Sequence, residues 1–220
     1  MNRTRFLRRL MKAAALAACA FAVIGASAPK DSDSDQALVT SALGYLDGLT
    51  DAKGRFVQIG PRGQESQGEV FLRRPGRARF QYDPPSDLVV VSDGHSVLVL
   101  DPRLKSFQSY PLGMTPLGPL LSRRVRLGRK TTISAVKRTA RGFDIAARRR
   151  QAGKAALVLD FSTNPIALIG WTVIGPQGQA TRVRLLNFKA SGPLPSNLFE
   201  LRDPEALPRP SRNRTFGLPD

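Results

Sequence analysis

Short apolar runs, each ended by Gly, Pro, Asp or Asn, follow one another along the chain from Gly54 to Lys189. Runs of about four to eight residues between such turn formers are typical of β-strands. The pattern predicts about eleven strands, near residues 55–59, 67–73, 78–83, 87–92, 96–101, 105–110, 131–138, 142–148, 155–161, 168–174 and 180–189. Turns recur at short, even intervals, so we expect a mainly β protein with a few helices, in which the strands form one curved antiparallel sheet or an unclosed barrel.

Two segments follow a helical period instead. Between Gln36 and Thr50 the apolar residues recur three or four positions apart, and a helix would gather them on one face: Leu38, Ala42, Tyr45, Leu46 and Leu49. Thr115 followed by Pro116 is a helix-start signal, which predicts a short helix presenting Leu117, Leu120 and Leu121. A last apolar piece over 193–201 is expected to pack against the domain.

The alternation within the predicted strands indicates which side chains face the core. Val70 and Leu72 share one face of their strand, and Ala78, Phe80 and Tyr82 share the inward face of the next. Asp93-Gly94 is predicted as a two-residue hairpin turn, in which Val90 faces Val97 and Leu88 faces Val99 on one side of the sheet. The outward positions Arg73, Arg77 and Arg79 are expected to lie in water.

Arg74 alone among these arginines projects from the apolar side, next to Pro75. A buried charge without a partner costs several kcal/mol, so a guanidinium at this position needs acceptors, for which the carbonyl groups at helix ends are suited. The alternative is that Arg74 lies past the end of its strand and reaches water. The pattern leaves both open.

Residues 1–28 have the composition of an export signal. Five basic residues precede an uncharged apolar run over 13–26, and Ala26–Ala28 follows as a small-residue cleavage pattern. We therefore expect a mature domain over 29–201 outside the cytoplasm. Leu16–Cys19 also resembles the site at which bacterial lipoproteins are cut and lipidated, so lipidation of Cys19 is the alternative.

The composition points away from catalysis. After residue 28 the chain has one histidine, His95, beside the predicted turn, and no cysteine. A lone imidazole lacks the partners of a catalytic triad or a zinc site. Asp47 and Asp51, four residues apart, are interpreted as solvated charges near a helix end. We expect a protein that is not an enzyme and that uses no cofactor or metal.

The chain is strongly basic, with a formal net charge of +17, of which +12 falls on residues 29–220. The basic clusters lie at 123–130, at 148–150 and in the Pro/Arg-rich tail 202–220, which is expected to be flexible. They carry no recognisable nucleic-acid motif with interleaved aromatic residues, so no nucleic-acid partner is expected. A solvated surface is the interpretation, with an acidic partner or an anionic membrane as the alternative.

The apolar side of the sheet permits two interpretations, which the composition does not separate. It can enclose a hollow that holds an apolar ligand under the helices, or its own side chains can fill that space as a core. The residues that would line the hollow are Val70, Leu72, Ala78, Phe80, Tyr82, Leu88, Val90, Val97, Val99, Leu117, Leu120 and Leu121.

Four fragments stand in series along the chain: "GRFVQ" (54–58), "GEVFLRRPGRARFQYDPP" (68–85), "LVVVSDGHSVLVLDP" (88–102) and "YPLGMTPLGPLL" (110–121). Together they resemble the periplasmic outer-membrane lipoprotein carrier (LolA) family. The resemblance is in order and spacing over residues 36–121, and looser through Phe199. It implies an unclosed antiparallel barrel with a helical lid over a hydrophobic cavity, no enzyme activity, and a monomer in the periplasm.

The resemblance also implies partners and one functional residue. Carriers of this family take acylated lipoproteins from an inner-membrane ABC-type release complex and pass them to an outer-membrane acceptor lipoprotein. The arginine before the proline of the family's "RP" motif, which closes the lid, falls on Arg74. Ala78 departs from the family, which often has a bulky residue there. A lipid-anchored acceptor and a periplasmic sensor or regulatory domain of the same fold are the alternatives.

Overall fold

The computed structural model describes residues 31–116, 118–123, 131–149 and 156–204. The expected export signal with Cys19, the residue Leu117 and the tail from residue 205 lie outside these residues. The helical elements are α1 (Asp31–Gly48), the 3₁₀ turn η1 (Leu112–Met114), α2 (Gly118–Leu121) and the 3₁₀ turn η2 (Ser196–Phe199). The strands are β1 (Asp51–Ile59), β2 (Glu65–Arg73), β3 (Arg77–Tyr82), β4 (Val89–Asp93), β5 (Ser96–Asp101), β6 (Ser106–Pro111), β7 (Thr131–Thr139), β8 (Gly142–Arg149), β9 (Ala156–Thr163), β10 (Ile166–Ile174) and β11 (Ala180–Ala190).

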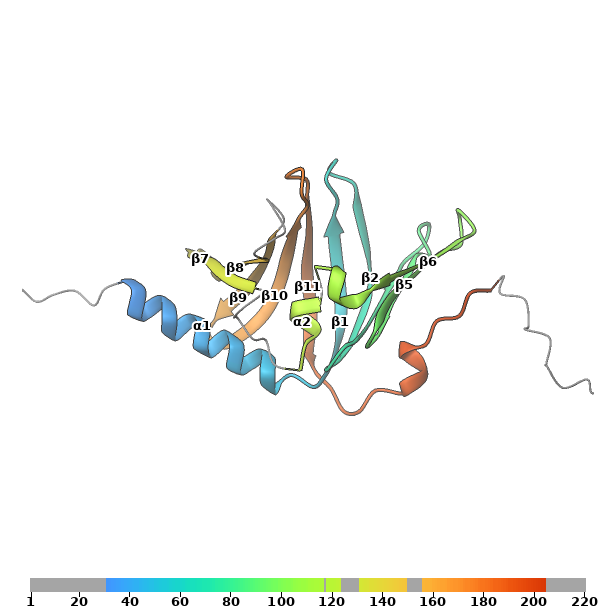
Figure 1. The fold of residues 1–220 in the computed structure, drawn as a ribbon. Coiled ribbons are helices and arrows are strands. Elements are labelled where there is room, and N and C mark those ends of the chain that lie inside the picture. Colours follow the sequence, from blue (N-terminus) through green and yellow to red (C-terminus); the bar gives the residue numbers. More distant parts are fainter. Residues whose placement is uncertain (1–30, 117, 124–130, 150–155, 205–220) are drawn as a thin grey trace, which may run out of the picture.

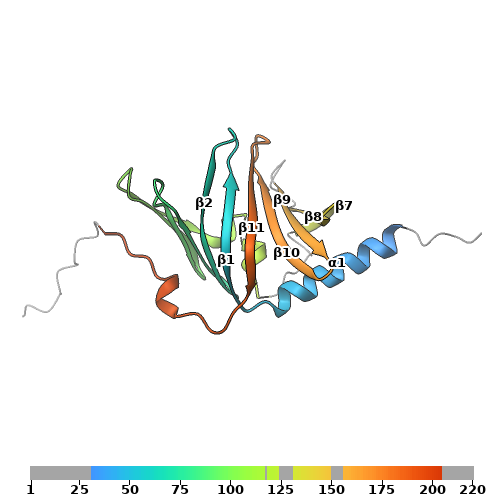
Figure 2. The same ribbon diagram turned by 180° about the vertical axis from the view of Figure 1, so that it is seen from behind.

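The eleven strands form a single antiparallel sheet in the order β6-β5-β4-β3-β2-β1-β11-β10-β9-β8-β7. The sheet has two halves, each a run of consecutive hairpins, and the pairing of β1 with β11 joins them. Its edges β6 and β7 do not pair with each other, so the sheet is curved but unclosed (Figures 1 and 2). The expectation of a mainly β, unclosed antiparallel fold with a few helices is confirmed.

Both helices cover one face of this sheet. Figure 1 shows α1 running past the lower ends of β9 and β10, with α2 in front of the middle strands. Apolar residues of both helices belong to the same buried cluster as the inward-facing side chains of β1, β2, β3, β8, β9, β10 and β11. The two halves of the sheet and the helices therefore share one core.

Aromatic rings connect the two halves of that core. Phe56 of β1 lies edge-on to Phe80 and to Tyr82, with ring centroids 5.6 and 4.9 Å apart. Phe80 in turn lies edge-on to Trp171 of β10 at 5.9 Å, across the β1–β11 join. Such aromatic pairs contribute about 0.5–1.5 kcal/mol each beyond the apolar area they bury.

The hairpin between β4 and β5 turns one residue later than the sequence predicts. The turn residues are Gly94 and His95, so Val90 pairs with Val99, and the predicted pairings of Val90 with Val97 and of Leu88 with Val99 are both wrong. The Asp93 side chain explains the shift, because its Oδ1 accepts hydrogen bonds from the backbone N–H groups of His95 and Ser96 at 2.8 Å each. A slip of two residues preserves the side-chain parity, so the face predicted for these valines is unchanged.

The C-terminal segment 191–201 covers part of the outer face of the sheet, where η2 lies against β3 and β4. The Arg73 guanidinium lies 5.4 Å from the centre of the Phe199 ring, and Arg79 Nη1 donates a hydrogen bond to the Leu198 carbonyl at 3.3 Å. Arg73, Arg77 and Arg79 are half-buried, so the expectation that they lie in water is wrong. Sequence alternation identified the outer face but not the segment that covers it.

Asp51 attaches this segment to the sheet. Its Oδ1 accepts hydrogen bonds from Arg73 Nε at 2.9 Å and from the Leu194 backbone N–H at 3.2 Å. We expect Asp51→Ala to weaken the attachment by about 1–3 kcal/mol, the usual cost of leaving such donors unpaired. Hydrogen exchange at residues 191–201 then accelerates by about tenfold or more. Asp101→Ala, which removes a carboxylate that caps an exposed turn, is the control and leaves this exchange unchanged. Equal protection in both variants would contradict the assignment.

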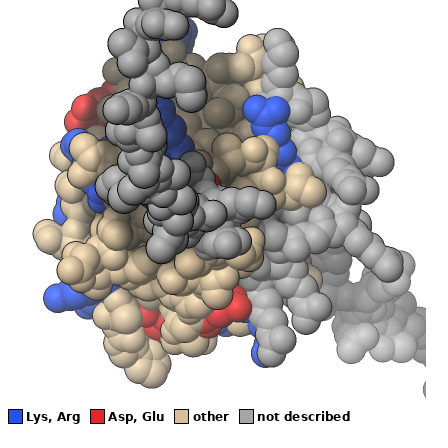
Figure 3. All heavy atoms as spheres, turned by 90° about the vertical axis from the view of Figure 1, so that its left-hand side faces the viewer, with Lys and Arg blue, Asp and Glu red and all other residues tan. Residues whose placement is uncertain are grey.

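On the face shown in Figure 3, Lys and Arg lie at separate positions around a surface of mainly uncharged residues. Among the described residues, no helix is both long enough and apolar enough to cross a membrane. No group of His, Cys, Asp or Glu in the described part of the chain is arranged to hold a metal ion.

Candidate functional site

The turn between β2 and β3 meets both helices. The backbone N–H of Arg74 donates to the carbonyl of Thr50, just after α1, at 2.7 Å. The backbone N–H of Gly76 donates to the carbonyl of Leu121, the last residue of α2, also at 2.7 Å. Two short backbone hydrogen bonds thus hold the ends of α1 and α2 at one place on the sheet.

Gly76 allows this turn to fit. Its φ of +81° lies in the left-handed region, and a Cβ there would lie 2.8 Å from the Cα of Gly94 in the next turn. The buried Ser92 hydroxyl donates to the Gly76 carbonyl at 2.6 Å. The turn is therefore held from the β4 side, which fixes the position of Arg74 relative to the helices.

The Arg74 side chain is buried between the two helices, with 7% of the residue exposed. Its Nη2 donates a hydrogen bond to the Ser122 carbonyl at 2.6 Å and lies 3.8 Å from Asp47 Oδ1 of α1. Burial lowers the pKa of the Arg74 guanidinium, and the Asp47 carboxylate opposes that change. Of the two predicted alternatives, the structure has the buried one, with a carbonyl at a helix end as acceptor.

Not all the hydrogen-bond donors of the Arg74 guanidinium have an acceptor among the described residues. Nε and Nη1 of Arg74 are buried and have no hydrogen-bond partner among the described residues. A buried unpaired donor costs about 1–3 kcal/mol, which offsets much of what the charge-assisted bond to Ser122 contributes. The guanidinium therefore links the two helices at a small net gain in free energy.

Asp47 and Asp51 have different partners from those expected. Each lies beside one of two consecutive arginines, Asp47 at 3.8 Å from Arg74 and Asp51 at 2.9 Å from Arg73. The interpretation of both as solvated charges is wrong for Asp51, which is largely buried, and incomplete for Asp47, whose side chain is 45% exposed. The missed signal is the pairing of two carboxylates with the "RR" dipeptide.

The structure brings together almost all the residues that the sequence assigned to the apolar side. Eight of the predicted lining residues are buried in the common cluster: Val70, Leu72, Ala78, Phe80, Tyr82, Val97, Leu120 and Leu121. Leu88, Val90 and Val99 are half-buried against it. Ala42 and Leu46 of α1 and Leu49, which directly follows that helix, are buried in the cluster, and Leu38 and Tyr45 of α1 pack against it half-buried. His95 is exposed, as expected.

The sequence reasoning missed the contribution of the second half of the sheet. Phe143, Phe161, Leu168 and Trp171 are all buried in the same cluster, as is Phe56 of β1 at the join of the two halves. The signal for some of them was available, because alternate residues in β8 and β9 are apolar and buried: Phe143, Ile145, Ala147, Leu157, Leu159 and Phe161. The apolar side thus extends over both halves of the sheet.

Tyr82 brings a polar group to this apolar side. Its hydroxyl donates a hydrogen bond to Gln58 Oε1 at 2.8 Å, and burial raises its pKa to about 12. The phenol therefore stays neutral at any physiological pH. The described apolar side of the sheet therefore offers contact mainly to apolar groups.

Comparison with known proteins agrees with this arrangement. The family model described as "Outer membrane lipoprotein carrier protein LolA" matches residues 47–202. An outer-membrane lipoprotein carrier protein from Legionella pneumophila (strain Paris) is 29% identical over 147 residues, covering 64% of this chain and 72% of the relative. One from Coxiella burnetii is 30% identical over 148 residues, covering 63% and 68%.

Solved structures with a similar chain course are more distant. A conserved protein from Thermus thermophilus has a TM-score of 0.48 at 13% identity, covering 79% of this chain and 96% of that one. A LolA superfamily protein from Nitrosomonas europaea has a TM-score of 0.42 at 9% identity, covering 74% and 97%. Since the family model matches more than half of the sequence, this chain belongs to the outer-membrane lipoprotein carrier (LolA) family.

Proposed function

We propose that the protein is a periplasmic carrier, which binds the acyl chains of lipoproteins released from the inner membrane and delivers them to an outer-membrane acceptor. The observation that carries the proposal is the apolar side of the unclosed sheet, covered by α1 and α2 and linked at Arg74. Residues 1–28 are assigned to an export signal. The mass of the mature N-terminus tests this assignment and decides whether Cys19 is lipidated.

The cargo explains why a carrier needs a broad apolar surface. Each methylene group removed from water contributes about 0.8 kcal/mol, so a chain of ~15 methylenes represents on the order of 12 kcal/mol. An acyl chain with that free-energy cost does not cross water unaided. The residues proposed to receive it are the eleven described lining residues together with Phe56 and Trp171.

The closing contact explains release. A carrier whose apolar side prefers to close on its own helices binds cargo less tightly, because opening subtracts from the gross binding energy. Arg74 contributes to closure by its hydrogen bond to Ser122. In this proposal an inner-membrane ABC-type complex supplies the energy for loading, and an acceptor that binds the acyl chains more tightly draws them onward.

The proposal predicts direct removal of cargo from a membrane. Purified protein incubated with inner-membrane vesicles, ATP and a fluorescent acylated lipoprotein is expected to release the label into the soluble fraction. The same lipoprotein without its acyl chains tests the role of the lipid and is expected to form no complex. If the protein left the acylated label in the vesicles in an assay where a known carrier removed it, the proposal would be wrong.

The position of the cargo is tested by photo-crosslinking. A photoreactive amino acid in place of Leu72 or Phe80, both on the apolar side, is expected to capture the acyl chain. The matched control is Arg79, which directly precedes Phe80 and points to the outer face, where η2 lies. Crosslinks of similar yield at Arg79 and at Phe80 would place the cargo elsewhere.

A further inference from the structure

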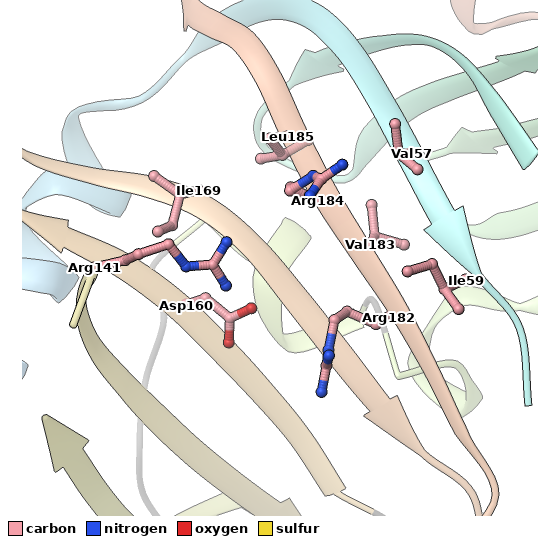
Figure 4. A pocket seen from close by; sticks show the side chains of 9 residues that line it. All are labelled: Val57, Ile59, Arg141, Asp160, Ile169, Arg182, Val183, Arg184 and Leu185. Carbon is pink, nitrogen blue, oxygen red and sulfur yellow. The ribbon is translucent and has the colours of Figure 1, made fainter. Parts of the chain in front are cut away.

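A pocket of about 330 Å³ opens on the outer face of the sheet, opposite the side that α1 and α2 cover. Its charged side chains are Arg141, Asp160, Arg182 and Arg184, and its apolar side chains include Val57, Ile59 and Ile169. Figure 4 shows Arg141 and Asp160 reaching toward the pocket from one side, and Arg182 and Arg184 standing on β11 at the other. None of these residues belongs to the proposed carrier site.

The strand register creates the pocket. Asp160 of β9, Gly170 of β10, Arg184 of β11 and Val57 of β1 are direct neighbours across four strands. Because Gly170 has no side chain, the row from Asp160 to Arg184, whose backbones lie two strand spacings or about 10 Å apart, has no side chain at its middle position. A Cβ on Gly170 would lie 2.5 Å from the Val183 carbonyl and 3.2 Å from Asp160 Oδ2, so it would fill the floor.

The charges around this floor do not pair with one another. Asp160 is half-buried, yet it forms no salt bridge and accepts no hydrogen bond from any described residue. Arg141 and Arg182 act on its carboxyl only through the electric field. Burial and the neighbouring Asp144 together raise the pKa of Asp160 to about 6, and the two arginines oppose that rise. Three guanidinium groups and one carboxyl that titrates near neutrality thus surround an open space.

We propose that this pocket binds a tetrahedral oxyanion of the phosphate-monoester class. The lining side chains carry three positive charges and one negative charge, and a phosphate monoester carries about −1.5 to −2 at pH 7. The planar fork of arginine matches the oxygen geometry of such anions. Ile59, which is 38% exposed, and Val57 lie where they contact the carbon atoms next to the phosphate.

Asp160 gives this site a pH dependence. The charged groups around its carboxyl are Asp144 from β8, Arg141 from the β7–β8 turn, and Arg182 and Arg184 from β11, while β10 contributes Gly170 and the uncharged Ile169. A bound dianion repels the ionised carboxyl, so binding favours the protonated form. Affinity for the dianion therefore rises as the pH falls through about 6.

Inorganic sulfate is the first probe, because it keeps the same charge between pH 5 and 8. Titration of the purified protein, followed by calorimetry and by the NMR signals of arginine Nε–H groups, is expected to show saturable binding. Arg182→Gln or Arg184→Gln weakens it by about tenfold or more, the effect of losing one charge-assisted hydrogen bond. Arg103→Gln, the same change in an exposed turn far along the sheet, leaves it unaltered.

Asp160→Asn distinguishes specific binding of an anion in this pocket from its nonspecific electrostatic attraction to a basic protein. This variant is expected to bind sulfate about tenfold more tightly at pH 7.5. A tenfold effect corresponds to sulfate raising the pKa of the Asp160 carboxyl by about one unit when it binds to the original protein. Its binding then varies far less between pH 5 and 8. An affinity that changes equally in Arg103→Gln and Arg182→Gln, or a pH dependence that persists in Asp160→Asn, overturns the proposal.

Two sources of the phosphate monoester are distinguished by the probes. Glycerol 3-phosphate tests a soluble ester, and phosphatidylcholine vesicles with and without phosphatidic acid test a lipid head group. Binding of either that depends on Arg182 and Arg184 supports the site and identifies the source. Absence of binding to both, in protein whose spectrum is unchanged, overturns it. None of these measurements involves lipoprotein transfer, so this inference and the proposed carrier function fail independently.

Discussion

Replacing Arg74 by leucine is expected to reduce delivery of lipoprotein to the outer-membrane acceptor by about tenfold or more, while the protein stays folded and still loads cargo. The substitution removes the hydrogen bond from Nη2 to the Ser122 carbonyl, which is 2.6 Å long and joins the sheet to the end of α2. A charge-assisted bond contributes about 1.5–3 kcal/mol, and the unpaired Nε and Nη1 offset part of it, so a net loss of about 1.4 kcal/mol shifts the equilibrium toward the open form by about tenfold. An open carrier grips the acyl chain more tightly and releases it less readily.

The fold is expected to tolerate this change. Leucine fills much of the same apolar space, and the two unpaired donors, Nε and Nη1, disappear with the guanidinium. Asp47 is 45% exposed at its side chain, so removal of Arg74 leaves no buried charge behind. Loading from inner-membrane vesicles and delivery to acceptor, measured as separate steps with purified components, separate the two effects.

Arg77→Leu is the matched control for this variant. Arg77 directly follows the same turn, as the first residue of β3 on the outer face, and it is half-buried like Arg73 and Arg79. Its replacement is expected to leave both steps of the assay within about twofold of the original protein. Should Arg74→Leu deliver cargo as well as the original protein does, Arg74 would have no part in release.

Phe161→Ala is expected to lower the free energy of unfolding by about 3–5 kcal/mol, the usual cost of removing a buried phenyl ring. Phe161 is 1% exposed, and its ring stacks on Phe143 with centroids 5.4 Å apart. The same ring lies edge-on to Tyr45 of α1 at 6.4 Å. It therefore connects β8, β9 and the helix, and the cavity left by alanine would weaken all three contacts at once.

Urea unfolding measures this loss of free energy, and the m-value (the slope of unfolding free energy against urea concentration) is compared between the variant and the original protein. Phe107→Ala is the control, since Phe107 lies half-buried on the edge strand β6 and is expected to cost about 1 kcal/mol. A loss for Phe161→Ala as small as that for Phe107→Ala would mean that α1 and the β8–β9 region do not share one core.

The alternation of apolar residues was enough to predict the strands. Each of the eleven predicted ranges overlaps an observed strand, because most strands alternate between buried and more exposed residues and end near a turn former. The same alternation singled out Arg74, because it places this arginine on the apolar face of the strand and the neighbouring arginines on the outer face. The buried guanidinium beside the two helices is a consequence of that parity and of the turn that follows it.

The features that alternation missed depend on contacts between distant parts of the chain. The Asp93 side chain shifts the β4–β5 turn by accepting two backbone hydrogen bonds, which a propensity for Asp-Gly turns does not reveal. The half-burial of Arg73 and Arg79 requires the segment around η2, more than a hundred residues later in the chain. The outer pocket requires the register of β9, β10 and β11, which places Gly170 between Asp160 and Arg184.

Only Leu49 and Thr50 separate α1 from β1, so any swing of this helix has to bend the chain at those two residues. The Thr50 carbonyl accepts its hydrogen bond from the backbone of residue 74, whatever side chain that residue carries. Arg74 thus makes two kinds of contact with α1. Its main chain holds the segment about which the helix would rotate, and its guanidinium lies beside Asp47 of the helix itself. Side-chain variants of Arg74 would therefore change how far α1 stands away from the sheet, while the axis about which it rotates stays in place.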